Sequence, residues 1–205
     1  NFLFYGIGSV AFGIKGNAFS WFLFFYYNIV IGLPAWMASL ALAIATIWDA
    51  ISDLIIGYSS DHTKSRLGRR HPYMYAALIP VPIFFVLLWN PPTFETDLNL
   101  FLYLLVMAIL VRTFTTLFEI PNQSLGPEIT REYHERTKMM SLRYFFGWMG
   151  GTVMTIFMYF VFLKPTVDYP NGQLNPEGYQ IYGFVAAFIM LAAMIISSRG
   201  LNHLI

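Results

Sequence analysis

The chain has 205 residues, of which 57% are hydrophobic, 19% aromatic and only 11% charged, and its mean hydropathy is +0.58. These values exclude an ordinary soluble domain and predict a membrane protein. The formal net charge of +1 indicates no nucleic-acid partner, and the lack of cysteine excludes disulfides, thiolate metal sites and cysteine nucleophiles.

Six apolar segments are long enough to span a membrane as helices, because a spanning helix needs about 20 apolar residues. They lie at 2–31, 34–58, 72–90, 99–121, 139–163 and 179–198. The fold class is therefore predicted to be an all-α membrane protein. The first segment is too long for a cleaved signal peptide and is interpreted as a true span. Both ends of the sequence look like cuts in a longer chain.

Prolines and glycines inside these segments predict local features of the bundle. Pro80 and Pro121 fall inside or at the end of spans, where they predict kinks. Gly147 and Gly151, with Gly150 between them, have the spacing of a small-residue packing face. We therefore expect the fifth segment to pack closely against a neighbour.

Positive charge is concentrated in two of the five connections. The connections at 59–71 and 126–138 carry Lys64, Arg66, Arg69, Arg70, Arg131, Arg136 and Lys138. The other three connections hold only Lys164. Because basic residues are retained on the cytoplasmic side, this pattern predicts that both basic connections and both termini are cytoplasmic.

Six ionisable residues fall within the predicted spans: Lys15, Asp49, Asp53, Arg112, Glu119 and Arg143. Each would cost about 2.5 to 3.5 kcal/mol near the bilayer centre if unpaired, so they are expected to face one another or water. Asp49 and Asp53 are four residues apart and share one helical face. A single cation or proton bound there would relieve the repulsion between the two carboxylates.

A structural ion-pair network is the alternative interpretation of these charges. In that network Asp49 or Asp53 would pair with Arg143, and Glu119 with Arg112, which lies seven residues away on the same helix. Intramembrane charges more often mark ion or substrate pathways, and the two interpretations can coexist. A long side chain such as that of Lys15 can also simply extend toward the membrane interface.

The first basic connection predicts either a topology signal or a cytoplasmic gate. Asp61 lies at the end of the second span, and Arg69 and Arg70 lie at the start of the third. These charges would set orientation in any case. As a gate, they would pair across helices in one conformation and separate in another.

The sequence contains no constellation that predicts an enzyme. All four histidines fall in or beside the predicted cytoplasmic connections, without metal-binding spacing. No serine, histidine and acid arrangement supports hydrolysis. We therefore expect neither catalysis nor a cofactor, and no metal beyond a Na⁺ at the acidic site.

Several motifs in order resemble one transporter family. "WDAISDLIIGYSSDHTKSRLGRRHPY", preceded by "YGIG" and "FFYYNIVIGLP" and followed by "EIPNQSLGPEIT" and "ERTKMMSLRYFFGWMGG", is similar to the glycoside-pentoside-hexuronide:cation symporters. These are the melibiose-permease-like branch of the major facilitator superfamily. The resemblance implies a twelve-helix transporter of the bacterial inner membrane, with 1–205 as its N-terminal six-helix bundle and a C-terminal bundle absent from this chain.

The resemblance also implies a cation site. The acids of the second span carry over to Asp49 and Asp53, and the fourth-span acid to Glu119. Thr116 matches a nearby hydroxyl, and Ser52 stands where the family has an asparagine. Hard oxygen ligands suit Na⁺, while carboxylates alone can serve H⁺, so the coupling ion stays open.

The implied sugar site is less complete than the cation site. The sugar-binding arginine of the family falls at Arg143, and a guanidinium suits that task because it donates to two oxygens at once. The aromatic residue on which a sugar stacks is replaced by Gln123. The first-span acid and its neighbouring lysine are replaced by Gly13 and Phe12.

Other polar residues are candidates to rebuild recognition of a glycoside or of a different solute. These are Lys15, Asn17 and Arg112. The sequence thus predicts a transporter in the lipid bilayer that works by alternating access. It would carry a small solute, with a glycoside as the favoured candidate, together with Na⁺ or H⁺. A lipid-like solute, suggested by the many aromatic residues, and a non-transporting sensor or scaffold remain as alternatives.

Overall fold

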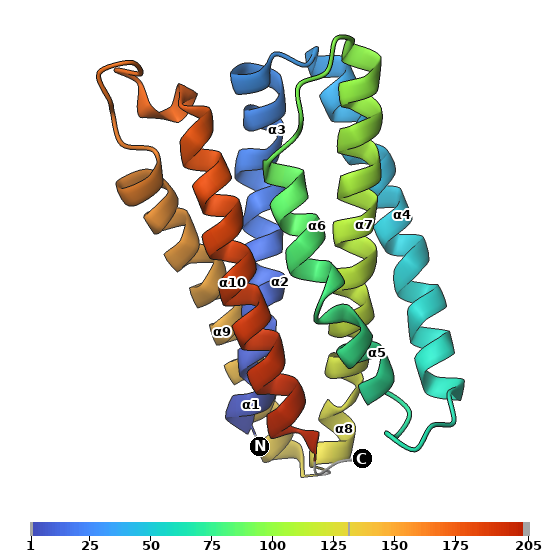
Figure 1. Ribbon diagram of the computed structural model, residues 1–205. Helices are drawn as coiled ribbons and strands as arrows, with labels where there is room; N and C mark the ends of the chain where they lie inside the picture. The colour runs from blue at the N-terminus through green and yellow to red at the C-terminus, as the bar shows by residue number, and fades with distance from the viewer. Residues whose placement is uncertain (1, 131, 203–205) are drawn as a thin grey trace.

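Helices make up the regular structure of residues 2–130 and 132–202, the residues that the computed structural model describes. In chain order they are α1 (Phe2–Ile7), α2 (Ser9–Asn17), η1 (Ala18–Phe22), α3 (Leu23–Phe25), η2 (Tyr26–Ile31), α4 (Ala35–His62), α5 (His71–Ala77), α6 (Pro80–Trp89), α7 (Asp97–Ser124), α8 (Gly126–Ile129), α9 (Tyr133–Phe157), η3 (Met158–Phe162), η4 (Gly172–Leu174) and α10 (Pro176–Gly200). The long helices stand side by side, and the described residues contain no strand (Figure 1). The predicted all-helical fold is confirmed.

Five helical stretches of the described chain are long and apolar enough to cross a membrane. They are Ala35–His62, His71–Trp89, Asp97–Ile129, Tyr133–Phe162 and Pro176–Gly200. Most begin before the predicted apolar segment because polar residues supply the first turn. At α10, for example, the Asn175 side chain accepts a hydrogen bond from the Glu177 N–H at 3.1 Å, and Pro176 fills the first helical position.

The predicted first span, 2–31, is a stack of short α- and π-helical segments that follow one another through residues of helical conformation such as Gly8, Ala18 and Leu23. Its longest piece, α2, has nine residues. Two stretches, η1 and η2, are wound as π-helix, which widens the turn and occurs often at functional sites. The stack ends at Gly32, whose φ of 101° is a left-handed conformation that favours glycine.

The third predicted span is interrupted just before Pro80, where a kink was expected. α5 ends at Ala77, and α6 starts with Pro80 as its first residue, where the missing N–H would have had no helical partner. Pro121 lies inside α7, which nevertheless continues to Ser124. The break at Pro80 tilts α5 relative to α6 (Figure 1).

Glycines bring α2 and α9 into close contact, which confirms the predicted packing face. A Cβ atom on Gly13 would overlap the main-chain carbonyl of Gly147. One on Gly151 would lie 2.7 Å from the Gly13 carbonyl oxygen, and one on Gly150 would lie 2.8 Å from Val10 Cγ1. The two backbones therefore touch where side chains would otherwise separate them.

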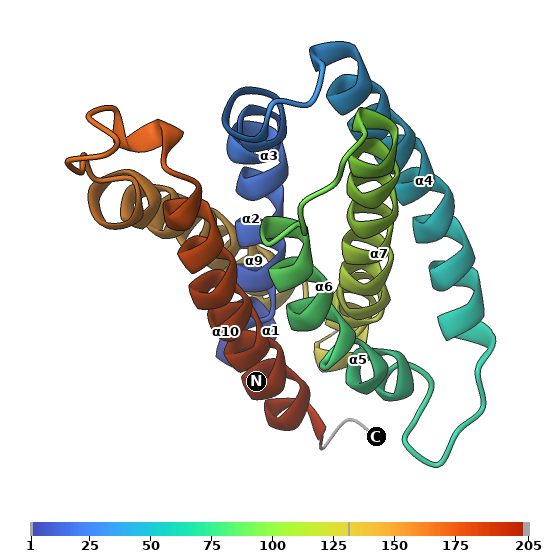
Figure 2. The ribbon, with the colours of Figure 1, turned by 45° about the horizontal axis from the view of Figure 1, so that its top comes forward.

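The ends of the chain and the basic connections lie at one end of the bundle. The start of α1, the α4–α5 connection, α8 and the end of α10 are together in both ribbon views (Figures 1 and 2). Arg131, counted in the second basic connection, lies outside the described residues. The described basic residues of the two connections thus share one side of the predicted membrane.

Buried aromatic residues tie the helices together at the opposite end. The Tyr26 hydroxyl donates to the Trp89 carbonyl at 3.1 Å, and the Tyr27 hydroxyl donates to the Leu88 carbonyl at 2.7 Å. The Tyr26 ring stacks on Tyr179 with centroids 4.7 Å apart. Burying these large rings with their hydroxyls paired holds η2, α6 and α10 in one arrangement.

Candidate functional site

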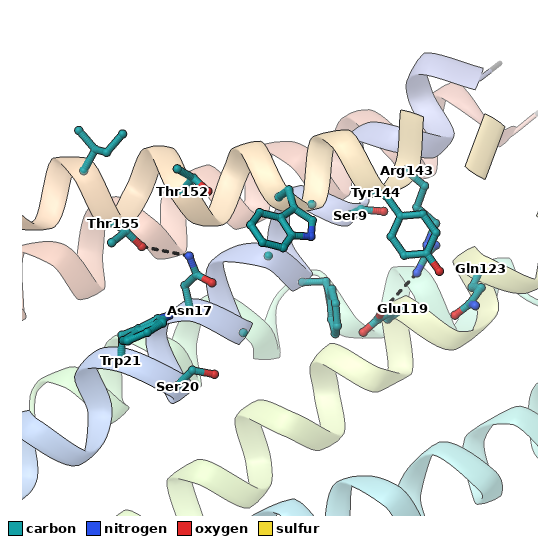
Figure 3. A pocket seen from close by; sticks show the side chains of 16 residues that line it. Ser9, Asn17, Ser20, Trp21, Glu119, Gln123, Arg143, Tyr144, Thr152 and Thr155 are labelled. Atoms are coloured by element: carbon teal, nitrogen blue, oxygen red, sulfur yellow. Dashed lines mark hydrogen bonds and ion pairs between the residues drawn. The ribbon is translucent and has the colours of Figure 1, made fainter. Parts of the chain in front are cut away.

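A cavity of about 760 Å³ opens between α2, η1 and α9, with α7 at its base. Its polar lining comes from all of these helices and comprises Ser9, Asn17, Ser20, Glu119, Gln123, Arg143, Thr152 and Thr155. Its apolar lining includes Phe12, Trp21, Tyr144, Trp148 and Ile156. Figure 3 shows these side chains around a common space. A cavity with mostly apolar walls and a few polar groups is typical of a small-molecule site.

An ion pair between α9 and α7 forms the base of the cavity. Arg143 Nη2 donates to Glu119 Oε1 at 3.2 Å, and Nη1 donates to Asn122 Oδ1 at 3.4 Å. The guanidinium carbon lies 5.6 Å from the centroid of the Tyr5 ring. Arg143 is only 7% exposed, so these contacts orient a buried guanidinium toward the cavity.

Two further predicted substrate residues lie on the same cavity. Asn17 Nδ2 donates to Thr155 Oγ1 at 3.0 Å, which links α2 to α9 away from the ion pair (Figure 3). Gln123 lies one turn beyond Glu119 on α7 and also lines the space. The structure therefore brings Arg143, Asn17 and Gln123 together from three separate segments.

Gly13 lines the cavity at a point where no side chain fits. Because a Cβ atom there would overlap the Gly147 carbonyl, the acidic residue that the resemblance led us to look for at this position could not be accommodated. The close contact of α2 with α9 thus explains this departure from the family pattern in physical terms.

Three large aromatic side chains at the cavity were not identified from the sequence. Trp21, Tyr144 and Trp148 line it and are 69%, 69% and 79% exposed. In an apolar helix, the sequence does not show whether an aromatic side chain faces a cavity or faces lipid. The available signal was helical spacing, since Tyr144 and Trp148 are four residues apart and next to Arg143 and Gly147.

Lys15 and Arg112, predicted to bind substrate, do not line this cavity but converge on Asp49. Arg112 Nη1 donates to Asp49 Oδ2 at 2.6 Å, and Lys15 Nζ lies 4.0 Å from the same oxygen. Thr116, a predicted cation ligand, donates its hydroxyl to Asp49 Oδ1 at 3.3 Å. Both carboxylate oxygens of Asp49 are therefore occupied by side chains of α2 and α7.

The alternative ion-pair network predicted from the sequence is wrong in its partners. Arg112 pairs with Asp49 and Arg143 with Glu119. The pairs expected from the sequence were instead Arg112 with Glu119, and Arg143 with an acid of the second span. Seven residues along a helix correspond to a rise of about 10.5 Å, so Arg112 and Glu119 are on one face of α7 but too far apart to meet. The neighbouring helices α4 and α9 supply the partners instead.

Asp53 differs from the other two intramembrane acids. It is half-buried and makes no hydrogen bond or ion pair within the described residues. The neighbouring Ser52, a predicted cation ligand, donates its hydroxyl to the Asp49 main-chain carbonyl at 2.9 Å. The Ser52 hydroxyl is therefore hydrogen-bonded within α4. Glu119 is within electrostatic range of Lys15, Arg143, Asp53 and Asp49.

The predicted acids do not form a single multidentate cluster. Within residues 2–130 and 132–202, no group of three or more His, Cys, Asp or Glu side chains is arranged to hold a metal ion. Asp49 faces Arg112, and Glu119 faces Arg143. Each acid therefore has its own environment, although all three lie on α4 and α7.

The predicted gate residues form ion pairs at the end of the bundle that carries the basic connections. Arg70 Nη2 lies 3.4 Å from Asp61 Oδ1 and 3.3 Å from Glu128 Oε1, and Arg69 Nη2 donates to the same Glu128 oxygen at 3.0 Å. Glu128, in α8, was not identified from the sequence. The available signal was an acid within the second basic connection, and only the fold brings it next to the positive charges of the first.

Apolar spanning helices that enclose a polar cavity and buried ion pairs define an integral membrane protein. The sequence profile of the family described as MFS/sugar transport protein matches residues 4–203. The chain belongs to this family of major-facilitator transporters, and the relationship indicated by its motifs is confirmed.

Three relatives illustrate the range of the family. An uncharacterized symporter of Synechocystis is 33% identical over 201 residues, covering 96% of this chain and 37% of the relative. The isoprimeverose transporter of Lactiplantibacillus pentosus is 27% identical over 192 residues, covering 94% and 39%. The sodium-dependent lysophosphatidylcholine symporter 1 of Xenopus tropicalis is 28% identical over 140 residues, covering 68% and 26%. The chain thus spans well under half the length of these relatives.

Proposed function

We propose that this chain is the N-terminal bundle of a secondary transporter that carries a glycoside or related small solute together with Na⁺ or H⁺. The observation that carries the proposal is the cavity between α2, α7 and α9, with the Arg143–Glu119 pair at its base. The names of the bacterial relatives, among them an isoprimeverose transporter and a glycoside/cation symporter, support a sugar-like solute. The proposed activity is transport and not catalysis, with no cofactor besides the coupling ion.

In this proposal the cavity recognises a glycoside through both its polar and its aromatic walls. Arg143 offers a planar fork that donates to two oxygens at once, and Asn17 and Gln123 offer amides that both donate and accept. Trp148 and Tyr144 present faces on which the apolar side of a sugar ring would stack. The open side of the cavity would face the C-terminal bundle of the full-length chain.

Transport would proceed by rocking of the two bundles around this midplane site. We place both basic connections and both termini of this segment in the cytoplasm of a bacterium, with the helices in its inner membrane. The Asp61–Arg70–Glu128 pairs would hold one conformation of the cytoplasmic gate and separate in the other.

The coupling ion would bind on the α4–α7 side of the bundle. Asp53 is the intramembrane acid without a partner among the described residues, and Glu119 lies within its electrostatic range. Binding of a cation at Asp53 would alter the field around Glu119 and hence the orientation of Arg143. Ion binding at Asp53 would in this way be coupled to solute binding at Arg143.

The substrate site is tested by Arg143→Gln in the full-length transporter, reconstituted in vesicles and offered a panel of glycosides under an imposed Na⁺ or pH gradient. Losing a charged hydrogen-bond donor at the cavity base should lower uptake at least about tenfold. The matched control is Arg136→Gln, which makes the same change at an exposed position of the same helix. Equal uptake by both variants would remove Arg143 from the substrate site.

The ion site is tested in the same vesicles by Asp53→Asn. Neutralising the unpaired acid should abolish accumulation against a gradient, because the ion would lose its charged ligand. Comparing Na⁺ and pH gradients identifies the ion. Undiminished accumulation would show that Asp53 is not part of the coupling site. Absence of counterflow in the wild type would instead favour a non-transporting sensor.

A lipid-like solute is the second candidate. It is favoured by the exposed Trp21, Tyr144 and Trp148 at the cavity and by the lysophosphatidylcholine symporter among the relatives. Long apolar tails would lie against these rings, while Arg143 would hold a phosphate. Uptake of a lysophospholipid in preference to every glycoside of the panel would establish this alternative.

A further inference from the structure

Arg112 and Lys15 form a positively charged enclosure around Asp49 that the proposed function leaves unexplained. Arg112 Nη1 donates to Asp49 Oδ2 at 2.6 Å, while its Nη2 donates to Thr46 Oγ1 at 3.2 Å. Its guanidinium carbon lies 4.6 Å from the centroid of the Phe19 ring. Arg112 is therefore fixed by α4 on one side and by the first helical stack on the other.

Lys15 adds a second positive charge at the same oxygen. Its Nζ lies 4.0 Å from Asp49 Oδ2 and 5.1 Å from the centroid of the Phe12 ring, and its side chain is 6% exposed. The stem of this lysine is buried and does not extend toward a membrane interface, which was the alternative considered for it. Thr116 donates to the remaining Asp49 oxygen. The Asp49 carboxylate thus faces a guanidinium, an ammonium and a hydroxyl group, so an incoming cation would meet two positive charges there.

The three acids and three bases of the spans carry no net charge together, but the bases are shared unevenly among the acids. Glu119 is paired with Arg143, and Asp49 has two cations against its single charge. Asp53 alone has no partner within the described residues. A mobile cation attracted to Asp53 would meet a carboxylate whose charge is unopposed, whereas one attracted to Asp49 would be repelled by Arg112 and Lys15.

We propose that Arg112, assisted by Lys15, is a built-in cation that permanently occupies Asp49, so that Arg112 determines which acid of α4 is open to the coupling ion. A guanidinium is suited to this position because it stays charged and is held by two hydrogen bonds and an aromatic face. Being part of the chain, it competes with Na⁺ at a high effective concentration. The assignment to coupling rests on the proposed function, while the occupation of Asp49 does not.

The inference is tested by binding of radioactive Na⁺ alone to the purified full-length protein. Arg112→Gln should expose Asp49 and raise Na⁺ affinity at least about tenfold, because a repelling charge has been removed from within 3 Å of its ligand oxygen. Adding Asp49→Asn to this variant should abolish the gain. Arg136→Gln, the same substitution at an exposed arginine, should give no gain.

The result that overturns the inference is an Arg112→Gln protein that binds Na⁺ no better than the wild type, or whose gain survives Asp49→Asn. If Arg112→Gln fails to fold in a Na⁺-free buffer, size-exclusion profiles with NaCl and choline chloride replace the binding assay. Recovery of the folded peak by Na⁺ but not by choline supports the inference, and no recovery overturns it. The proposed function is judged separately, by solute accumulation in the wild type.

Discussion

Two buried ion pairs anchor α7 to its neighbours, and they differ in what surrounds them. Arg143–Glu119 joins α9 to α7 and lines the open cavity. Arg112–Asp49 joins α4 to α7 and is contacted by Lys15 and the Phe19 ring, and its side chains are 14% and 20% exposed against 8% and 16% for Arg143 and Glu119. Both pairs consist of the same residue types at membrane depth. The pairs differ instead in their neighbours, because one lines the cavity and the other has a second cation beside its acid.

The largest effect is expected from Asp49→Asn, which would leave Arg112 and Lys15 without an acid between them. Removing one partner of a buried pair costs about 3 to 5 kcal/mol, because the remaining charge is uncompensated. The melting temperature of the purified full-length protein should fall sharply. Adding Arg112→Gln should recover most of the loss, and no recovery in the double variant would show that the two residues are not energetically coupled.

Gly13→Ala should have the next largest effect, on the side of the molecule that carries the cavity. The added methyl would overlap the Gly147 carbonyl, and such overpacking costs about 1 to 3 kcal/mol. Gly16→Ala in the same helix is the control, since no atom lies within 4 Å of its added Cβ. Thermal unfolding that treats the two substitutions alike would contradict the backbone contact between α2 and α9.

Glu119→Gln should be less destabilising than Asp49→Asn, which tests the comparison directly. An amide oxygen can still accept from Arg143, and Glu119→Gln leaves one cation without its acid whereas Asp49→Asn leaves two, so the loss should be about 1 to 2 kcal/mol. Gradient-driven uptake should nevertheless fall strongly, because the variant lacks the charge that orients Arg143. A loss of stability equal to that of Asp49→Asn would show that the second cation at Asp49 adds nothing to the cost of losing the acid.

The smallest effect on stability is expected from Arg69→Gln in the gate. The Arg69 and Glu128 side chains are 56% and 34% exposed, and pairs of this kind contribute about 0.2 to 1 kcal/mol. The effect should shrink further as salt is added, since exposed charges are screened. Its readout is the rate of counterflow, which should change while the melting temperature hardly moves. A salt-independent loss of several degrees would mean that this pair is structural.

Much of the fold follows from local sequence signals. The helices follow the apolar runs, the break before α6 follows Pro80, and the α2–α9 contact follows the spacing of Gly147, Gly150 and Gly151. Most of their starts were placed too late because polar residues such as Asn175 cap helices outside the apolar run. Helix formation and small-residue packing depend on neighbours in sequence, so these features can be read from the chain.

The site was predicted less completely. Arg143, Asn17 and Gln123 do share a cavity, but Trp21, Tyr144 and Trp148 were missed because exposure cannot be read from an apolar helix. Glu128 was missed because its partners are more than fifty residues away in sequence. Spacing along a helix says which face a residue shares, and not which other helix lies opposite.

By itself, the sequence determined that this is an all-helical membrane protein of the major facilitator kind, with six ionisable residues within its spans. Only the tertiary structure decided the partners. Asp49 pairs with Arg112 and Glu119 pairs with Arg143, while Asp53 has no partner among the described residues. The physical reason is that the free energy of placing charges in a membrane depends on how many there are, which the sequence shows. Which charges pair depends on how neighbouring helices are aligned along the membrane normal, which only the fold shows.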